Sequence, residues 1–222
     1  MKFVYPQIDT VFETDSGTVP CLVIEQQDLL VRLVEDIAGQ QAGGVGQAVV
    51  SHDNTVLNFA KAVELLDTFI PFDMNRKPLI TRLNAELEAA AMHAERYEQT
   101  ARLMADIENY LYDLAYGCPG SLSFPKLSVA SLIKGAGLSI ESDHNSLSDR
   151  LLTYFEMVTE LEREKLFITL NLRSFINDAD MAAFLETVLG HGYHLLLIES
   201  KDHPRLPNEK RTIIDADLCE IG

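Results

Sequence analysis

The segment from Pro78 to Leu114 constrains the fold of this chain more than any other segment. It contains no internal proline or glycine, and its apolar or small residues recur in steps of three and four, which is the spacing of one helix face. At about 1.5 Å per residue, an unbroken helix of this length would span roughly 55 Å, more than the width of a small domain. The sequence therefore predicts a projecting helix that packs against later helices or another subunit. The stripe consists of Leu79, Leu83, Leu87, Ala90, Ala94, Tyr97, Ala101, Met104, Ile107, Leu111 and Leu114.

The segments on either side of this helix have the pattern of an α/β protein. Residues 19–24 form a short, almost continuously apolar run, typical of a strand buried on both faces of a sheet. A helical apolar period follows at once over residues 26–40. Near the C-terminus, an apolar run over 166–171, a helical segment over 178–191 and a second apolar run over 195–199 predict two parallel strands joined by a right-handed crossover. A final strand is expected over 212–221.

These patterns predict two lobes. The first is an α/β head with a mostly parallel sheet, formed by residues 1–73 plus 165–222. The second is an α-helical leg, residues 74–164, inserted into the head. Besides the long helix, the leg is expected to contain a short helix from residue 128 to about 136 and another over 146–164.

Composition narrows the function classes. Eighteen Lys and Arg against 34 Asp and Glu give a formal net charge of −16, which excludes a broadly basic nucleic-acid binder. A hydrophobic content of 47% excludes a disordered chain. Three cysteines without a CxxC pair suggest reduced thiols, and no apolar run is long enough to cross a membrane. We expect a cytoplasmic protein with no membrane partner.

Polar residues end three of the predicted buried strands, at Glu25, Asn171 and Glu199. Ligands bind at this edge in open parallel sheets. No Gly-x-x-x-x-Gly-Lys-Ser/Thr segment is present, and the glycines at 43–46 precede a predicted strand, so the sheet is P-loop-like without a functional P-loop. An ATPase or metal-dependent nuclease using Glu25, Glu199 and Asp215 remains an alternative, but turn and cap roles are favoured. We assign no catalytic residue.

The six histidines show no recognisable catalytic or metal-binding pairing along the sequence. His191 and His194 lie three residues apart, but Gly192 separates them at a predicted helix-to-strand turn. A metal-binding pair there is the weaker interpretation.

Basic residues cluster at the start of the long helix. Arg76, Lys77 and Arg82 lie within a segment that carries no acidic residue. Near a helix N-terminus they oppose the macrodipole, and a bound anion would offset that cost. The alternative is that they pair with carboxylates such as Glu86 or face water, as most surface charges do.

Six segments, taken in order, resemble the Csn-two family of CRISPR-associated proteins. They are Val23–Glu25, Phe72–Lys77, Leu132–Leu138, Leu166–Asn171, Leu195–Ser200 and Ile213–Ile221. The resemblance spans the chain and implies a type II-A adaptation protein required for spacer acquisition without being the integrase. It also implies an α/β head, a helical leg, and a homotetrameric ring supported by calcium. Such a ring binds double-stranded DNA, typically at its ends, without sequence preference and without enzymatic activity.

The resemblance assigns roles by region. Arg76, Lys77 and Arg82 are the candidate DNA-facing residues, with Lys61 and Lys134 as further candidates. For calcium it points to Glu141 and Asp143. Residues 117–129, often acid-rich in relatives, carry no carboxylate here. Two carboxylates fall short of the six to eight oxygens that calcium takes, so carbonyls or a second subunit would have to complete the shell.

The resemblance also implies partners. They are further copies of the chain, double-stranded DNA, the CRISPR integrase complex and the RNA-guided effector nuclease. A protein-only scaffold that docks these enzymes through an acidic exterior is the remaining alternative, and it would survive a loss of DNA binding.

Overall fold

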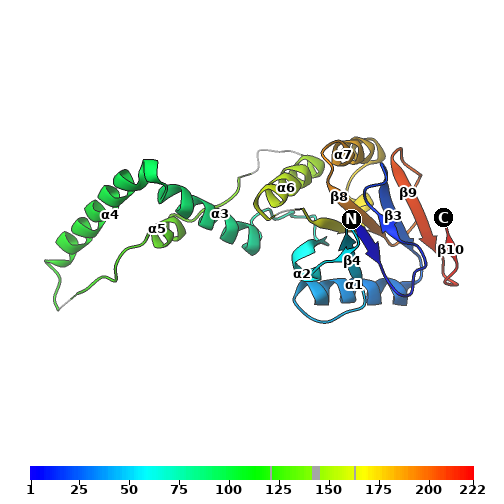
Figure 1. The fold of residues 1–222 in the computed structure, drawn as a ribbon, viewed down its shortest axis with the longest axis horizontal. Coiled ribbons are helices and arrows are strands. Elements are labelled where there is room, and N and C mark those ends of the chain that lie inside the picture. The colour runs from blue at the N-terminus through cyan, green and yellow to red at the C-terminus, as the bar shows by residue number, and fades with distance from the viewer. Residues whose placement is uncertain (121, 142–145, 163) are drawn as a thin grey trace. The chain divides into compact units, whose positions relative to one another are not determined.

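A six-stranded sheet forms the centre of the larger part of the molecule (Figure 1). A computed structural model describes residues 1–120, 122–141, 146–162 and 164–222. The strand order is β10-β9-β3-β8-β7-β6, and every pairing is parallel except that of β10 with β9. The predicted α/β class with a mostly parallel sheet is confirmed. The strands are β3 (Val19–Ile24), β6 (Val63–Leu66), β7 (Leu166–Leu170), β8 (His194–Glu199), β9 (Glu209–Ile214) and β10 (Glu220–Ile221).

A smaller antiparallel sheet with the order β2-β1-β4-β5 lies in the same part of the chain. A hairpin joins β4 to β5, with Asp53 and Asn54 at its turn. Both turn residues have positive φ angles, 47° and 61°, as tight hairpin turns require. The strands are β1 (Lys2–Val4), β2 (Phe12–Glu13), β4 (Val49–His52) and β5 (Thr55–Val56).

Helices cover both faces of the large sheet, because successive side chains of a buried strand point to opposite faces. Ile168 of β7 joins the core cluster that includes Leu29 and Leu33 of α1. Its neighbour Phe167 stacks on Phe155 of α6, with ring centroids 3.9 Å apart. The helical elements here are α1 (Gln27–Gln41), α2 (Phe59–Ala62), α6 (Leu147–Glu162), the 3₁₀ helix η1 (Leu172–Ser174) and α7 (Asp178–Gly190).

The chain divides into two compact units: Met1–Met74 with Ser142–Gly222, and Asn75–Glu141. We call these the first and the second unit. Helix α6 belongs to the first unit, whereas the sequence analysis placed it in the leg. The Tyr154 hydroxyl of α6 donates a 2.8 Å hydrogen bond to Glu64 of β6, and Phe155 stacks on β7. The apolar period of α6 predicted a buried face but did not specify which unit would bury it.

The second unit contains helices α3 (Lys77–Ala91), α4 (Ala94–Ala115) and α5 (Val129–Ala136). The prediction of one helix over 78–114 is therefore wrong. His93 is extended, with φ −63° and ψ 147°, and it is the N-cap of α4, while the Thr100 hydroxyl donates to the Ala91 carbonyl at 2.8 Å. No proline or glycine marks this break, so the sequence did not reveal it.

The expected strand over 212–221 is also interrupted. β9 ends at Ile214, and the Asp215 carboxylate accepts backbone hydrogen bonds from Asp217 and Cys219 at 2.9 and 2.8 Å. This turn allows β10 to pair antiparallel with β9. Within the described ranges, no helix combines the length and the apolar character needed to cross a membrane.

Candidate nucleic-acid interface and the carboxylates of the sheet

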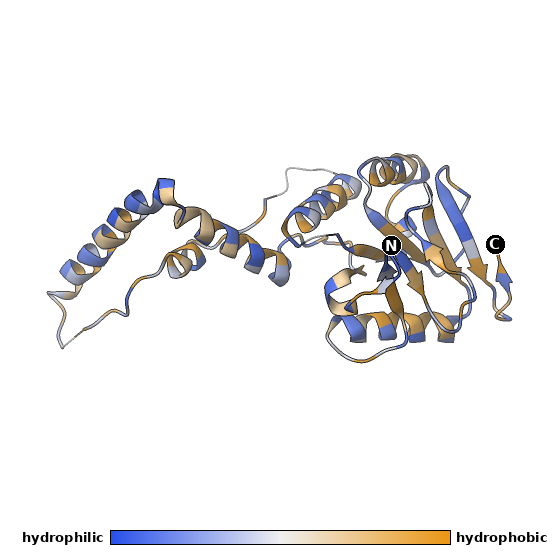
Figure 2. Cartoon of the chain, in the orientation of Figure 1, coloured by the Kyte–Doolittle hydropathy of each residue, from blue (hydrophilic) through white to orange (hydrophobic). Residues whose placement is uncertain are grey.

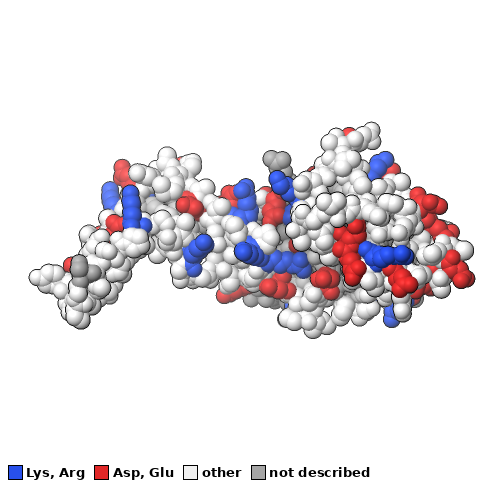
Figure 3. Space-filling view, turned by 90° about the horizontal axis from the view of Figure 1, so that it is seen from below, with Lys and Arg blue, Asp and Glu red and all other residues white. Residues whose placement is uncertain are grey.

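Lys77 and Lys134 line the same surface hollow of the second unit, which has a volume of about 420 Å³. Lys77 is the first residue of α3 and Lys134 lies in the last turn of α5. Helix α5 ends there because Gly137 adopts a left-handed conformation with φ 74°. Both lysines are exposed, and Figure 3 shows Lys and Arg side chains gathered over α3. The fold thus joins two basic residues that are far apart in the sequence.

The N-terminus of α3 favours an anion. Its N-cap residue is Arg76, which makes no side-chain cap hydrogen bond, since a guanidinium has no acceptor. The first turn contains Pro78 and no acidic residue. The N-cap and the first turn of α3 thus supply no carboxylate to the backbone N–H groups at the helix start, and the field of these groups adds to that of the two lysines.

The other basic candidates have different surroundings. Arg82 forms an ion pair with Glu86, with a nitrogen-to-oxygen distance of 2.9 Å, which is the alternative that the sequence analysis named. Arg76 and Arg82 each make further polar or electrostatic interactions. Lys61 is exposed on α2 and belongs to the first unit. Lys77 and Lys134 are therefore the pair of candidates that share one surface.

The calcium candidates do not form a site among the described residues. Glu141 is exposed at the end of the second unit, and Asp143 lies outside the described residues. Among those described, one group of His, Cys, Asp or Glu side chains lies close enough to hold a metal ion, and Glu141 is not in it. Calcium binding by Glu141 and Asp143 therefore stays a prediction, because the described residues include only one of the two.

The three acids of the enzymatic alternative occupy unlike environments. Glu25 is exposed, Asp215 caps the turn before β10, and Glu199 is buried. Only Glu25 and Gln26 connect β3 to α1, and the Gln26 side chain caps the Leu29 backbone N–H. This connection is too short for a phosphate-binding loop.

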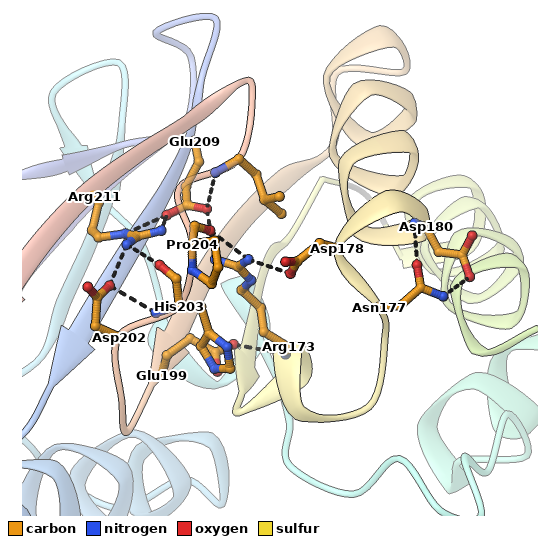
Figure 4. A network of polar contacts seen from close by, with 11 residues as sticks. Arg173, Asn177, Asp178, Asp180, Glu199, Asp202, His203, Pro204, Glu209 and Arg211 are labelled. Atoms are coloured by element: carbon orange, nitrogen blue, oxygen red, sulfur yellow. Dashed lines mark hydrogen bonds and ion pairs between the residues drawn. The ribbon is translucent and has the colours of Figure 1, made fainter.

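Glu199 belongs to a buried polar network at the large sheet (Figure 4). Its Oε1 accepts a hydrogen bond from the backbone nitrogen of Arg173 at 3.1 Å, and its Oε2 lies 3.7 Å from Nε2 of His203. Burial raises the pKa of Glu199 to about 7, although the Arg173 backbone and charge oppose this shift. Burial also disfavours the charged form of His203, and it therefore lowers the pKa of that ring.

Arg173 connects this network to two further acids. Its guanidinium donates to Glu209 at 3.2 Å, to Asp178 at 2.9 Å and to the Pro204 carbonyl at 2.8 Å. Glu209 also pairs with Arg211. Because the Arg173 and Glu209 side chains are 1% and 0% exposed, this pair is costly to break and leaves little room for a substrate.

A second cluster, missed in the sequence analysis, contains His52, Glu164 and His194. One ligand atom from each residue lies within 4.8 Å of the others. His52 ends β4, His194 begins β8, and Glu164 precedes β7. No local spacing signals this group, because it forms only where the small sheet meets the large sheet.

These features define an α/β protein whose parallel sheet lacks a phosphate loop and whose helical insertion presents basic residues on an otherwise acidic chain. A family model described as CRISPR-associated protein (Cas_Csn2) matches residues 40–218. The chain therefore belongs to the Cas_Csn2 family, as the resemblance predicted. Membership implies a CRISPR-associated role in adaptation, and the family is not known as an enzyme family.

A solved structure supports the same fold. The chain is similar to the crystal structure of Stu0660 of Streptococcus thermophilus, with a TM-score of 0.54 and 13% sequence identity. The match covers 89% of this chain and 68% of that chain. No curated protein matched this sequence.

Proposed function

We propose that this chain is a non-enzymatic, double-stranded DNA-binding protein of CRISPR adaptation that acts as a ring of four subunits. The observation that carries the DNA-binding part is the pair Lys77 and Lys134 on one hollow, at the start of α3, where the first turn holds no acidic residue. This surface has the chemistry of a phosphate site, since lysines and helix N–H groups both bind phosphate oxygens. Phosphate contacts carry no sequence information, so binding is independent of sequence.

The acidic net charge is compatible with this function. Figure 3 shows several acidic patches on the first unit, with basic side chains among them, and basic side chains in the region of α3 of the second. A ring of four would bring four copies of the Lys77 and Lys134 surface to one duplex. Each phosphate neutralised adds roughly 0.9 to the slope of log affinity against log salt, so four weak sites together give strong, salt-sensitive binding.

Ring formation has its own support. Helix α4 has no buried residue in the described chain, yet Leu103, Tyr110 and Leu114 lie on one of its faces at 52%, 62% and 55% exposure. Their spacing of seven and four residues is that of a helix seam. A second copy of the chain would bury this exposed face of α4.

Duplex binding to linear DNA tests the proposal. Lys77→Ala with Lys134→Ala should weaken binding and lower the salt slope by nearly two per subunit engaged. Lys126→Ala with Arg102→Ala is the matched control, because it removes the same charge from the second unit. Equal affinity and slope for wild type and the Lys77/Lys134 variant would exclude this surface. A covalently closed circle should bind more weakly than linear duplex, since threading a ring requires an end.

We infer no enzymatic role, and incubation with ATP, or with duplex and magnesium or manganese, tests this directly. Released phosphate or cleaved DNA would overturn it. The proposal also includes docking of the integrase complex and the RNA-guided effector nuclease on the acidic exterior. Co-elution of these partners with the Lys77/Lys134 variant would separate docking from DNA binding.

A further inference from the structure

Three side chains with metal-binding atoms meet in the first unit. His52 ends β4 of the small sheet, His194 begins β8 of the large sheet, and Glu164 lies between α6 and β7. The two imidazole rings have centroids 6.0 Å apart, and Nε2 of His194 lies 3.9 Å from the Glu164 carboxylate. One atom from each of the three lies within 4.8 Å of the others.

The surroundings of His194 define which ring nitrogen is free to bind a metal. Its Nδ1 lies 3.1 Å from the Asp15 carboxylate and 2.9 Å from the Thr14 hydroxyl. That hydroxyl donates its proton to the Met1 carbonyl, so it accepts from His194, as the carboxylate does. Nδ1 therefore carries the proton, and the lone pair is on Nε2, which points to Glu164.

This arrangement is the one that metal-binding histidines show in proteins. Such a histidine donates its second ring N–H to a carboxylate, which fixes the ring and its tautomer. Here Asp15 is that carboxylate.

His52 supplies a second, independent observation. Its Nδ1 is buried and has no hydrogen-bond partner within the part of the chain that the structure describes. A buried ring nitrogen without a partner is costly, and a ligand at this position would offset that cost. The contact of its Nε2 with Asp53, at 3.4 Å, is to a side chain that is 91% exposed.

We propose that His52, His194 and Glu164 form a binding site for a zinc-class divalent transition-metal ion, with Asp15 positioning His194. Two imidazoles and one carboxylate suit zinc, whereas calcium takes oxygen ligands. Tetrahedral ligands about 2.1 Å from zinc lie about 3.4 Å apart, so the cluster must contract by roughly an ångström. Glu164 can make that movement because its side chain is 64% exposed.

The ion would join three parts of the first unit: the small sheet, the large sheet and the segment after α6. Three protein ligands leave the fourth position of a tetrahedron to water. Since the site forms only in the folded chain, the ion should also raise the unfolding temperature.

Zinc titration of the untagged protein tests the proposal, with calcium present throughout to occupy oxygen-only sites. We expect one zinc per chain by calorimetry, and a cobalt(II) derivative with the visible absorption of a four-coordinate site. His52→Ala and His194→Ala should abolish both signals. Asp15→Asn should weaken binding 10- to 100-fold, as loss of a positioning carboxylate does.

Two variants keep the test decisive if His194→Ala does not fold. Glu164→Gln changes an exposed side chain and should weaken zinc binding at least tenfold, with the unfolding temperature of the zinc-free protein unchanged. His191→Ala is the matched control and should bind as wild type does, because His191 lies outside the cluster. The proposal would be overturned if wild type did not bind stoichiometric zinc. It would also be overturned if the His52→Ala and Glu164→Gln variants bound zinc with the affinity of wild type.

Discussion

Helices α6 and α4 have similar amphipathic patterns, yet their apolar faces lie in different environments. Helix α6 buries Leu151, Tyr154, Phe155 and Val158 against the first unit. Helix α4 is longer but buries no residue within the described chain. Figure 2 shows the contrast, with apolar strands beside α6 and mixed polar and apolar residues along α4. An apolar period thus predicts a helix face, and the neighbouring elements decide whether that face becomes core or remains available to a partner.

Charged residues differ between the two units in the same way. In the first unit, Arg173 and Glu209 are almost fully buried and pair with each other. In the second unit, Arg102 and Glu98 pair at 80% and 84% exposure. Buried pairs are costly to break, and exposed pairs contribute little. The Arg173–Glu209 pair is therefore part of the interior of the first unit, whereas the Arg102–Glu98 pair of the second unit remains accessible to solvent.

The largest effect is expected from Arg173→Ala. Removal of the guanidinium leaves Glu209 and Asp178 without this partner, and the buried Glu209 is the main cost. We expect a loss of about 3–5 kcal/mol in the free energy of unfolding, measured by urea denaturation. A loss below about 1 kcal/mol would show that the network is not a stability element.

Glu199→Gln should change how stability depends on pH. The folded pKa is about 7, above that of the unfolded chain near 4.3. Between these values the folded state holds a proton that the unfolded state releases, so this group's contribution to stability falls as pH rises. The free energy of unfolding of the variant, relative to that of wild type, should therefore rise by on the order of 3 kcal/mol between pH 4 and pH 8.

Urea unfolding of both proteins at several pH values measures that difference. The glutamine amide in this variant keeps an oxygen that can accept from the Arg173 backbone, so the network should survive the exchange. A difference between the two proteins that stays constant from pH 4 to pH 8 would contradict the raised pKa.

Substitution of the exposed face of α4 should weaken the association of subunits without unfolding the single chain. Replacing Leu103, Tyr110 and Leu114 with serine should change the free energy of unfolding of a single chain by about 0.5 kcal/mol or less per site, as for surface positions. The molar mass by light scattering should fall from that of a tetramer. An unchanged mass would move the subunit contact to another surface.

The smallest effect is expected from Arg102→Ala. Its i,i+4 pair with Glu98 is exposed, so its loss should cost about 0.3–0.5 kcal/mol at low salt and less at high salt. Compared with Arg173→Ala, this variant measures how much less the loss of an exposed ion pair changes the free energy of unfolding than the loss of a buried pair. A loss above about 2 kcal/mol in the free energy of unfolding would contradict the difference between the buried and the exposed pair.

Much of the fold was predictable from local patterns. The runs at 19–24 and 195–199 are too short for buried helices and too apolar for surface strands, and both form central parallel strands. The break at His93 was not predictable, because no proline or glycine interrupts the helical period there. For α6, the pattern specified an apolar face without its partner.

The candidate sites, too, were predictable from the sequence only in part. The cluster of Arg76, Lys77 and Arg82 was visible in the sequence as a basic segment without an acid. Its link to Lys134 depends on the packing of α5 against α3. The enzymatic alternative is weakened because Glu199 is buried among Arg173 and His203.

The sequence by itself determined the α/β class, the lack of a phosphate loop and the concentration of basic residues at the start of α3. These properties follow from composition and short-range spacing, which the chain carries in any conformation. Only the tertiary structure decided that α6 joins the first unit and that His52, Glu164 and His194 meet. Strand order and sheet packing bring distant residues together, and no local period encodes that proximity.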